Sequence, residues 1–200
     1  MSTATLIKEV ALHLFAQKGY EGTALSEIAD GVGIKKPSLY AHFNGKDDLF
    51  VTVFKEVLDE YTSSIHMALK ELNGKYTAEE KLRHLLFCHC RYYKDHKEHA
   101  AFLKRATLFP PSELAECLHT EFSIAEVIMN EWLIALFQEG IDSGEIHAAN
   151  IDDLLATYNC LIDGFFLQMF YYKEQDAGIK IQSAWKIFWQ GISDGSKPNG

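Results

Sequence analysis

Four side chains that donate hydrogen bonds lie close together near the N-terminus: Lys36, Ser38, Tyr40 and His42. None of them is acidic, and each can donate to a phosphate oxygen or to an acceptor on a base edge. Residues 31–46 contain three lysines and no acid, so the segment is locally positive. Because exposed charges beyond about 8–10 Å are screened, this local charge matters more to a nearby phosphate than the net charge of −9.

Two short helices joined by a tight turn are predicted to position these side chains. We expect the first helix over residues 25–32 and the second over residues 37–43, a helix-turn-helix. Ala29 is small where crossing helices approach closely, Gly33 suits a left-handed turn residue, and Pro37 suits the first position of a helix. The apolar contacts between the helices are assigned to Ile28, Val32, Ile34 and Leu39.

A second anion-binding feature follows directly in the sequence, Gly45-Lys46-Asp47-Asp48. Gly45 can cap a long helix, and the two aspartates suit the positive end of its dipole. Lys46 and the free amides of the first turn are therefore predicted to bind one phosphate of a DNA backbone.

The motifs FAQKGYEGT (15–23), IA (28–29), GIKKPSLYAHF (33–43) and KDDL (46–49) resemble the N-terminal domain of the TetR/AcrR family of bacterial transcriptional regulators. The specific match covers about residues 6–50, and weaker similarity occurs at residues 140–146 and 161–164. The resemblance implies an all-α homodimer. Its three N-terminal helices would bind operator DNA, and its C-terminal body would bind a small inducer and dimerise.

Carried over by position, Tyr40, His42 and Lys46 correspond to phosphate-contacting residues, and residues 36–38 to the base-facing start of the recognition helix. The full set assigned to DNA binding is Thr23, Lys35, Lys36, Pro37, Ser38, Tyr40, His42 and Lys46. Ala24 stands where the family commonly has Ser or Thr, so Thr23 is expected to cap the second helix. Residues 1–50 contain no arginine, the commonest bidentate partner of guanine. Lys36 could contact guanine instead, with a less strict geometry than arginine requires.

The rest of the chain predicts an all-α protein of about nine helices, because apolar residues recur at helical spacing throughout. Thr77 with Glu80 is typical of a capping box that opens a helix. We assign a DNA-binding domain to residues 1–48 and a ligand-binding and dimerisation domain to residues 49–200. Four cysteines among 200 residues, and no apolar run long enough to cross a bilayer, favour a soluble cytoplasmic protein without a membrane partner.

Aromatic residues of the second domain are assigned to a ligand pocket and a dimer face. The pocket is predicted to involve Phe87, Phe102, Phe122, Trp132, Tyr158 and Phe165. The dimer face, on the last two helices, is predicted to involve Phe166, Phe170, Trp185, Phe188 and Trp189. The helix over residues 151–172 is apolar over more than one face, which favours an intersubunit helical interface.

Histidines and cysteines cluster between residues 84 and 99: His84, Cys88, His89, Cys90, His96 and His99. Cys88 and Cys90 point about 200° apart on a helix and cannot bind one ion together. The favoured interpretation is therefore core thiols with surface histidines, and neither a metal nor another cofactor is expected. No nucleophile elbow, Walker loop, dinucleotide fingerprint or zinc-protease motif is present, which argues against an enzyme.

These patterns together predict a ligand-responsive transcriptional regulator. We expect a homodimeric repressor that binds a palindromic operator and is released by a small apolar or aromatic effector. Two alternatives remain: a helical ligand-binding or protein-interaction module whose N-terminal helices merely pack, and a small all-α enzyme or metal sensor that uses the His/Cys cluster.

Overall fold

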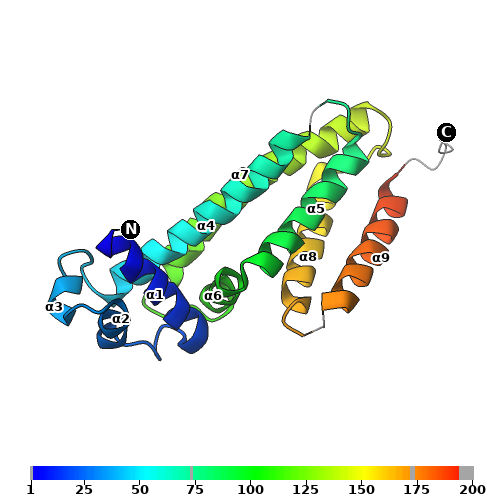
Figure 1. Ribbon diagram of the computed structural model, residues 1–200. Coiled ribbons are helices and arrows are strands. Elements are labelled where there is room, and N and C mark those ends of the chain that lie inside the picture. Colours follow the sequence, from blue (N-terminus) through cyan, green and yellow to red (C-terminus); the bar gives the residue numbers. More distant parts are fainter. Residues whose placement is uncertain (1, 73, 172–173, 194–200) are drawn as a thin grey trace. The chain divides into compact units, whose positions relative to one another are not determined.

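The computed structural model describes residues 2–72, 74–171 and 174–193, and these residues are predominantly helical (Figure 1). The helices within them are α1 (Thr3–Lys18), α2 (Leu25–Val32), α3 (Lys36–Leu39), α4 (Lys46–Glu71), α5 (Ala78–Asp95), α6 (Lys97–Leu108), α7 (Ala115–Asp142), α8 (Ile151–Gln168) and α9 (Glu174–Ile192). One isolated antiparallel bridge pairs Ile146 with Ser193. The predicted all-α class is confirmed. Within the described ranges, no helix has the length and apolar character needed to span a bilayer.

The chain divides into two compact units. The first comprises residues 1–62 and 96–126, and the second comprises residues 63–95 and 127–200. The boundary assigned from the sequence, between residues 48 and 49, therefore lies inside the first unit. The three N-terminal helices share a packing unit with the first part of α4, with α6 and with the start of α7.

An aromatic core holds the first unit together. The rings of Phe15 and Phe50 lie 4.8 Å apart edge to face, and those of Phe50 and Phe102 lie 5.1 Å apart. Arg105 of α6 donates through Nε to the Ala16 carbonyl and through Nη2 to the Gln17 carbonyl, each at 3.0 Å. These carbonyls belong to the last turn of α1, where helical partners are missing. Arg105 therefore joins α6 to α1 by satisfying groups that the fold would otherwise leave exposed.

In the second unit, α5, α8 and α9 pack on one another. Tyr158 of α8 is fully buried, and its hydroxyl donates to the Leu82 carbonyl of α5 at 2.7 Å. The ring of Tyr158 also lies edge to face with Phe137 of α7, at 5.9 Å. A buried tyrosine whose hydroxyl is satisfied contributes apolar area without leaving a polar group unpaired.

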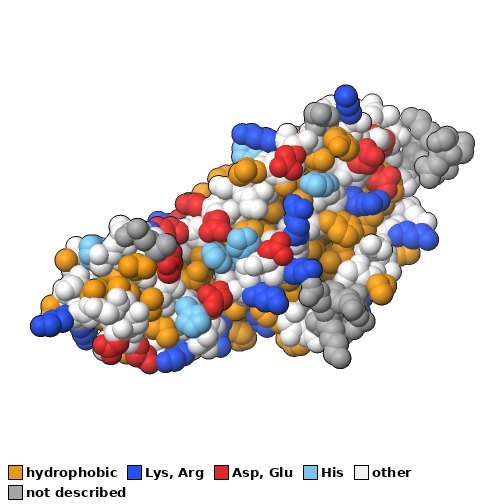
Figure 2. Space-filling model, viewed as in Figure 1, with side chains coloured by type: hydrophobic (Ala, Val, Ile, Leu, Met, Phe, Trp, Pro, Cys, Tyr) orange, Lys and Arg blue, Asp and Glu red, His pale blue; other side chains and the backbone are white. Residues whose placement is uncertain are grey.

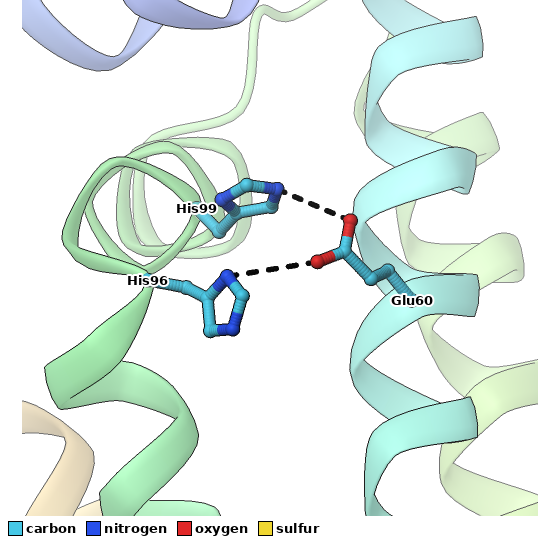
Figure 3. A group of neighbouring side chains, drawn as sticks. All are labelled: Glu60, His96 and His99. Atoms are coloured by element: carbon cyan, nitrogen blue, oxygen red, sulfur yellow. Dashed lines mark ion pairs between the residues drawn. The ribbon is translucent and has the colours of Figure 1, made fainter.

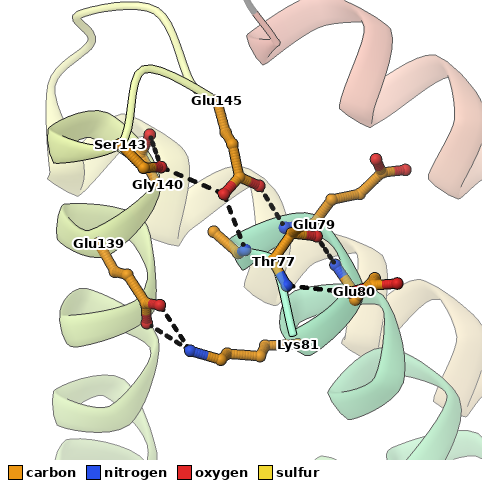
Figure 4. Close-up of polar contacts among 9 residues, drawn as sticks. Thr77, Glu79, Glu80, Lys81, Glu139, Gly140, Ser143 and Glu145 are labelled. Atoms are coloured by element: carbon orange, nitrogen blue, oxygen red, sulfur yellow. Dashed lines mark hydrogen bonds and ion pairs between the residues drawn. The ribbon is translucent and has the colours of Figure 1, made fainter. Parts of the chain in front are cut away.

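The N-terminus of α5 is closed by side chains from two places in the sequence (Figure 4). The predicted capping box is confirmed: the Thr77 amide donates to Glu80, and the Glu80 amide donates to the Thr77 hydroxyl. Glu145 accepts the amides of residues 78 and 79, at 3.3 and 3.2 Å. Next to this cap, Lys81 donates to both oxygens of Glu139, at 2.5 and 2.8 Å. A carboxylate at this end of a helix satisfies free amides and favours the helix dipole.

We expect Glu145→Ala to lower the free energy of unfolding by about 1–2 kcal/mol, because the α5 amides lose their acceptor. Glu131→Ala, which removes an exposed acid of α7, is the matched control and should change it by less than about 0.5 kcal/mol. Urea denaturation followed by circular dichroism at fixed protein concentration measures both. Equal effects of the two substitutions would show that the Glu145 cap contributes nothing to stability.

Candidate nucleic-acid interface

A left-handed glycine joins α2 to α3. Gly33 has φ 78° and ψ 29°, and its amide bonds back to α2, as does that of Ile34, which donates to the Ala29 carbonyl at 2.9 Å. Ile28 and Ala29 are buried on α2, and Leu39 is fully buried on α3. The predicted left-handed turn at Gly33 is confirmed, and glycine adopts this conformation at least cost.

The second helix of this motif is shorter than predicted. The sequence predicts a helix over residues 37–43, but α3 covers Lys36–Leu39, with Lys35 as its N-cap and Pro37 one place later than expected. The chain continues in turns in which the amides of Ala41 and His42 donate to carbonyls three residues earlier. This i→i+3 pattern tightens the backbone after α3 and ends the regular helix.

The residues predicted to contact DNA on and around α3 point away from the core. The exposed set is Lys35, Lys36, Pro37, Ser38, Tyr40 and His42. Tyr40 is 52% exposed, whereas Leu39 and Phe43 are 0% and 7% exposed. In Figure 2, basic side chains lie at the end of the first unit that carries α3. Burial of the apolar positions thus leaves a face of cationic and neutral donors in solvent, which we call the α3 face.

Lys46 is not the unattached phosphate donor that the sequence suggested. Its ammonium donates to the Tyr20 carbonyl at 2.9 Å and to the Thr23 carbonyl at 3.2 Å, and it lies 4.0 Å from the centre of the Tyr20 ring. The Tyr20 hydroxyl donates to Asp47. Burial, and then this hydrogen bond, raise the pKa of Tyr20. Lys46 therefore ties the start of α4 to the loop between α1 and α2, and keeps at most one N–H for another acceptor.

The capping role expected of Thr23 is wrong. Thr23 is 1% exposed, and its hydroxyl donates to the Gly19 carbonyl at 2.8 Å, so its side chain is not presented to a duplex. The N-cap of α2 is Ala24, which has no side-chain acceptor. Glu27 instead accepts the Ala24 amide at 3.0 Å and pairs with Lys18 at 2.6 Å. Glu27 lies three residues after the N-cap, a spacing that could have indicated this half of a capping box.

The six residues assigned to a ligand pocket are divided between the two units. Phe102 and Phe122 belong to the first unit, where Phe102 is part of the aromatic core. The other four belong to the second unit, in which an open groove of about 1220 Å³ runs along α5 and α9. Among the six, Phe87 alone lines that groove in the described part of the chain, beside Trp185 and Trp189.

The five residues assigned to a dimer face divide between core and surface. Trp185 and Phe188 are 4% and 8% exposed and belong to the interior of the second unit. Phe166 and Trp189 are half-buried, and Phe170 is 38% exposed. The aromatic density of α9 is therefore explained in part by packing within one chain. The most exposed apolar side chains of α9 are Ile179 and Ile187, at 67% and 70%.

The thiols of the His/Cys cluster are poor ligands. Burial raises the pKa of the Cys88 thiol and raises that of Cys90 to about 12. Burial also lowers the pKa of His89 to about 3. Because a thiol binds metal as the thiolate, these neutral groups of α5 agree with the interpretation of core thiols. His89 is 4% exposed, so the expectation of a surface histidine is wrong at this position.

The chain has a helix-turn-helix with an exposed, acid-free face, and further helices follow it. This arrangement is typical of helix-turn-helix regulators. Residues 7–53 match the family model described as "Bacterial regulatory proteins, tetR family". The chain is 28% identical over 145 residues to the probable HTH-type transcriptional regulator YttP of Bacillus subtilis, covering 72% of this chain and 66% of that protein. It is 27% identical over 144 residues to the fatty acid metabolism regulator protein of Bacillus subtilis, covering 70% and 69%.

Among solved structures, the regulator FadR of Bacillus subtilis in complex with stearoyl-CoA shares the fold, with a TM-score of 0.75 at 22% identity. The superposition covers 94% of this chain and 98% of that one. The match over residues 7–53 and the similarity to these relatives support an assignment to the TetR family of bacterial regulatory proteins. Its matched relatives are transcriptional regulators, so the chain is classed with regulators and not with enzymes.

We expect Gly33→Ala to destabilise the protein by about 1–2 kcal/mol, because alanine is strained in a left-handed turn. No heavy atom lies within 4 Å of the added Cβ, so the cost is conformational and not steric. Gly33→Asn should recover part of the loss, since asparagine tolerates this conformation. Thermal melts of the two variants test the assignment, and an alanine variant as stable as the wild type would contradict it.

Proposed function

We propose that the protein is a cytoplasmic, ligand-responsive transcriptional repressor that binds a palindromic DNA operator as a homodimer. The observation that carries this proposal is the α3 face, on which Lys35, Lys36, Ser38, Tyr40 and His42 are all exposed while Leu39 is buried between them in sequence. Acid-free clusters of donors on a short helix suit the major groove, where phosphates and base acceptors lie close together.

Within this proposal the α3 face has two parts. Lys36, Pro37 and Ser38 at the start of α3 face the bases, and Lys36 is the candidate reader of guanine. Lys35, Tyr40 and His42 contact phosphates on either side and fix the register of the helix in the groove. Lys46 contributes mainly by holding the start of α4 in place, since two of its donors are used within the protein.

A homodimer supplies the second recognition helix. Two such helices in successive major grooves are separated by about 34–36 Å and read a site with two-fold symmetry. Half-buried and exposed apolar residues of the last two helices and of the turn after α8 support an interface there: Phe166, Phe170, Trp189, Ile179 and Ile187. Trp185 and Phe188 would then support this surface as buried core residues beneath it.

The groove of the second unit is the candidate effector site. Its apolar residues Phe87, Trp185 and Trp189 suit an acyl or aromatic group. Arg83 and Lys186 suit attached phosphates, although the carboxylates of Glu79, Glu80 and Glu145 line the same groove. A long-chain acyl thioester fits both properties and is the kind of ligand named for the similar FadR structure. An effector that prefers one conformation of the dimer lowers DNA affinity by its differential binding. The α4 helix, which runs through residues of both units, is the continuous element that can transmit this change.

Alanine substitution of Lys35 and Lys36 is expected to weaken binding to the DNA upstream of the protein's own gene. Each lost phosphate contact should lower the slope of log affinity against log salt by about 1. Fluorescence anisotropy over a salt series measures the slope. Lys70→Ala, at an exposed site of α4 in the second unit, is the control that removes one lysine outside the α3 face. Unchanged affinity and slope in the Lys35/Lys36 variant would remove the α3 face from the interface.

Addition of stearoyl-CoA is expected to reduce the affinity of the wild-type protein for this DNA. Phe87→Asp should bind the DNA normally but resist release, because a carboxylate in the groove disfavours an acyl chain. Met67→Asp, at a 65% exposed position outside the groove lining, should respond like the wild type. Equal release of Phe87→Asp and wild type would place the effector elsewhere.

A further inference from the structure

Three side chains with metal-binding atoms converge in the first unit (Figure 3). Glu60 extends from α4, His96 is the N-cap of α6, and His99 lies in the first turn of α6. One ligand atom from each of the three lies within 4.8 Å of the others. The sequence placed His96 and His99 three residues apart, but it did not indicate that a carboxylate 36 residues earlier faces them both.

The atoms of two pairs in this group lie at ion-pair distance. His96 Nδ1 lies 3.6 Å from one oxygen of Glu60, and His99 Nε2 lies 3.4 Å from the other. A charge-assisted hydrogen bond would bring such atoms to about 2.7–2.9 Å. Two ligands at about 2.0–2.1 Å from a tetrahedral ion lie about 3.4 Å apart. The two observed distances, which end on different oxygens of Glu60, are therefore close to the separation of two ligands of one ion.

The elements that carry these ligands are already fixed in place. Arg105 joins α6 to the last turn of α1. A carboxylate oxygen of Glu98 also lies 2.6 Å from Nδ1 of His13 on α1. Side-chain exposure is 40% for His96, 21% for His99 and 51% for Glu60. The site is thus held on helices and yet open to solvent on one side, so an ion can enter and a fourth ligand can be water.

We propose that Glu60, His96 and His99 bind a divalent transition-metal ion of the zinc type. Two imidazoles and one carboxylate form a donor set that zinc uses when it keeps an open position for water. Imidazole ligands favour zinc, nickel, copper or iron over magnesium and calcium, which prefer oxygen. The bound ion would connect α4 to α6 within the unit that carries the α3 face.

The test uses the full chain, freed of metal with a chelator and then titrated with zinc chloride in competition with a chromophoric chelator. The wild type is expected to bind one zinc ion per chain at this site. Glu60→Gln and His99→Gln should each weaken binding by at least about tenfold. His119→Gln, which removes an exposed histidine of α7 in the same unit, is the matched control and should bind like the wild type.

Thermal melting supplies a second readout. Zinc should raise the melting temperature of the wild type and of His119→Gln but not that of Glu60→Gln, because a ligand of the folded state stabilises it by mass action. Cooperative melting of each metal-free variant shows that it is folded, and His96→Gln replaces any variant that fails to fold.

Cobalt(II) identifies the ligands by absorption. Nitrogen and oxygen ligands give visible d–d bands without the strong thiolate charge-transfer band that cysteine ligands give. A thiolate band would assign the ion to cysteines and overturn the proposal. Failure of the wild type to bind zinc, or equal zinc affinity in wild type, Glu60→Gln and His99→Gln, would overturn it as well.

Discussion

Burial of Leu39 on a four-residue helix is the constraint on which the DNA-facing surface depends. α3 is too short to hold its own direction by helical hydrogen bonds alone, since most of its backbone groups lack a partner within the helix. Its orientation is set by the packing of α3 on α2 and by the left-handed turn at Gly33. With Leu39 inward, the neighbouring residues on both sides face solvent, so one apolar contact determines where the donors point.

Basic side chains in the first unit serve two different purposes. Lys46 and Arg105 donate to backbone carbonyls at the ends of α1 and in the following loop, and so hold α4 and α6 against the N-terminal helices. Lys35 and Lys36 remain in solvent on the α3 face. In a chain with a net charge of −9, this division matters, because the lysines left for a phosphate are few and their placement must be rigid. Glu60 of α4 also lies 3.6 Å from His96 and 3.4 Å from His99 of the α6 N-terminus.

The sequence was sufficient for several features that depend on near neighbours, although the cap of α2 and the end of α3 were predicted wrongly. Helical periodicity, the capping box at Thr77 and Glu80, and the left-handed Gly33 each follow from spacings of a few residues. Long-range pairings were not predictable in this way. No local pattern indicates that Lys46 would bond the carbonyls of the α1–α2 loop, or that Glu60 would meet His96 and His99. Aromatic content likewise could not separate Trp185 and Phe188, which are core, from Phe170, which is exposed, because both environments favour the same residue types.

The most direct test of the central claim is to titrate the isotope-labelled full chain with an operator duplex and follow its backbone amides by NMR. The account predicts that the largest shift changes fall at Lys36, Ser38 and His42, with smaller changes along α2. It also predicts that a scrambled duplex of the same length produces weaker changes at these same amides. Saturating binding that leaves the α3 amides unperturbed, while other residues of the chain shift, would contradict the account.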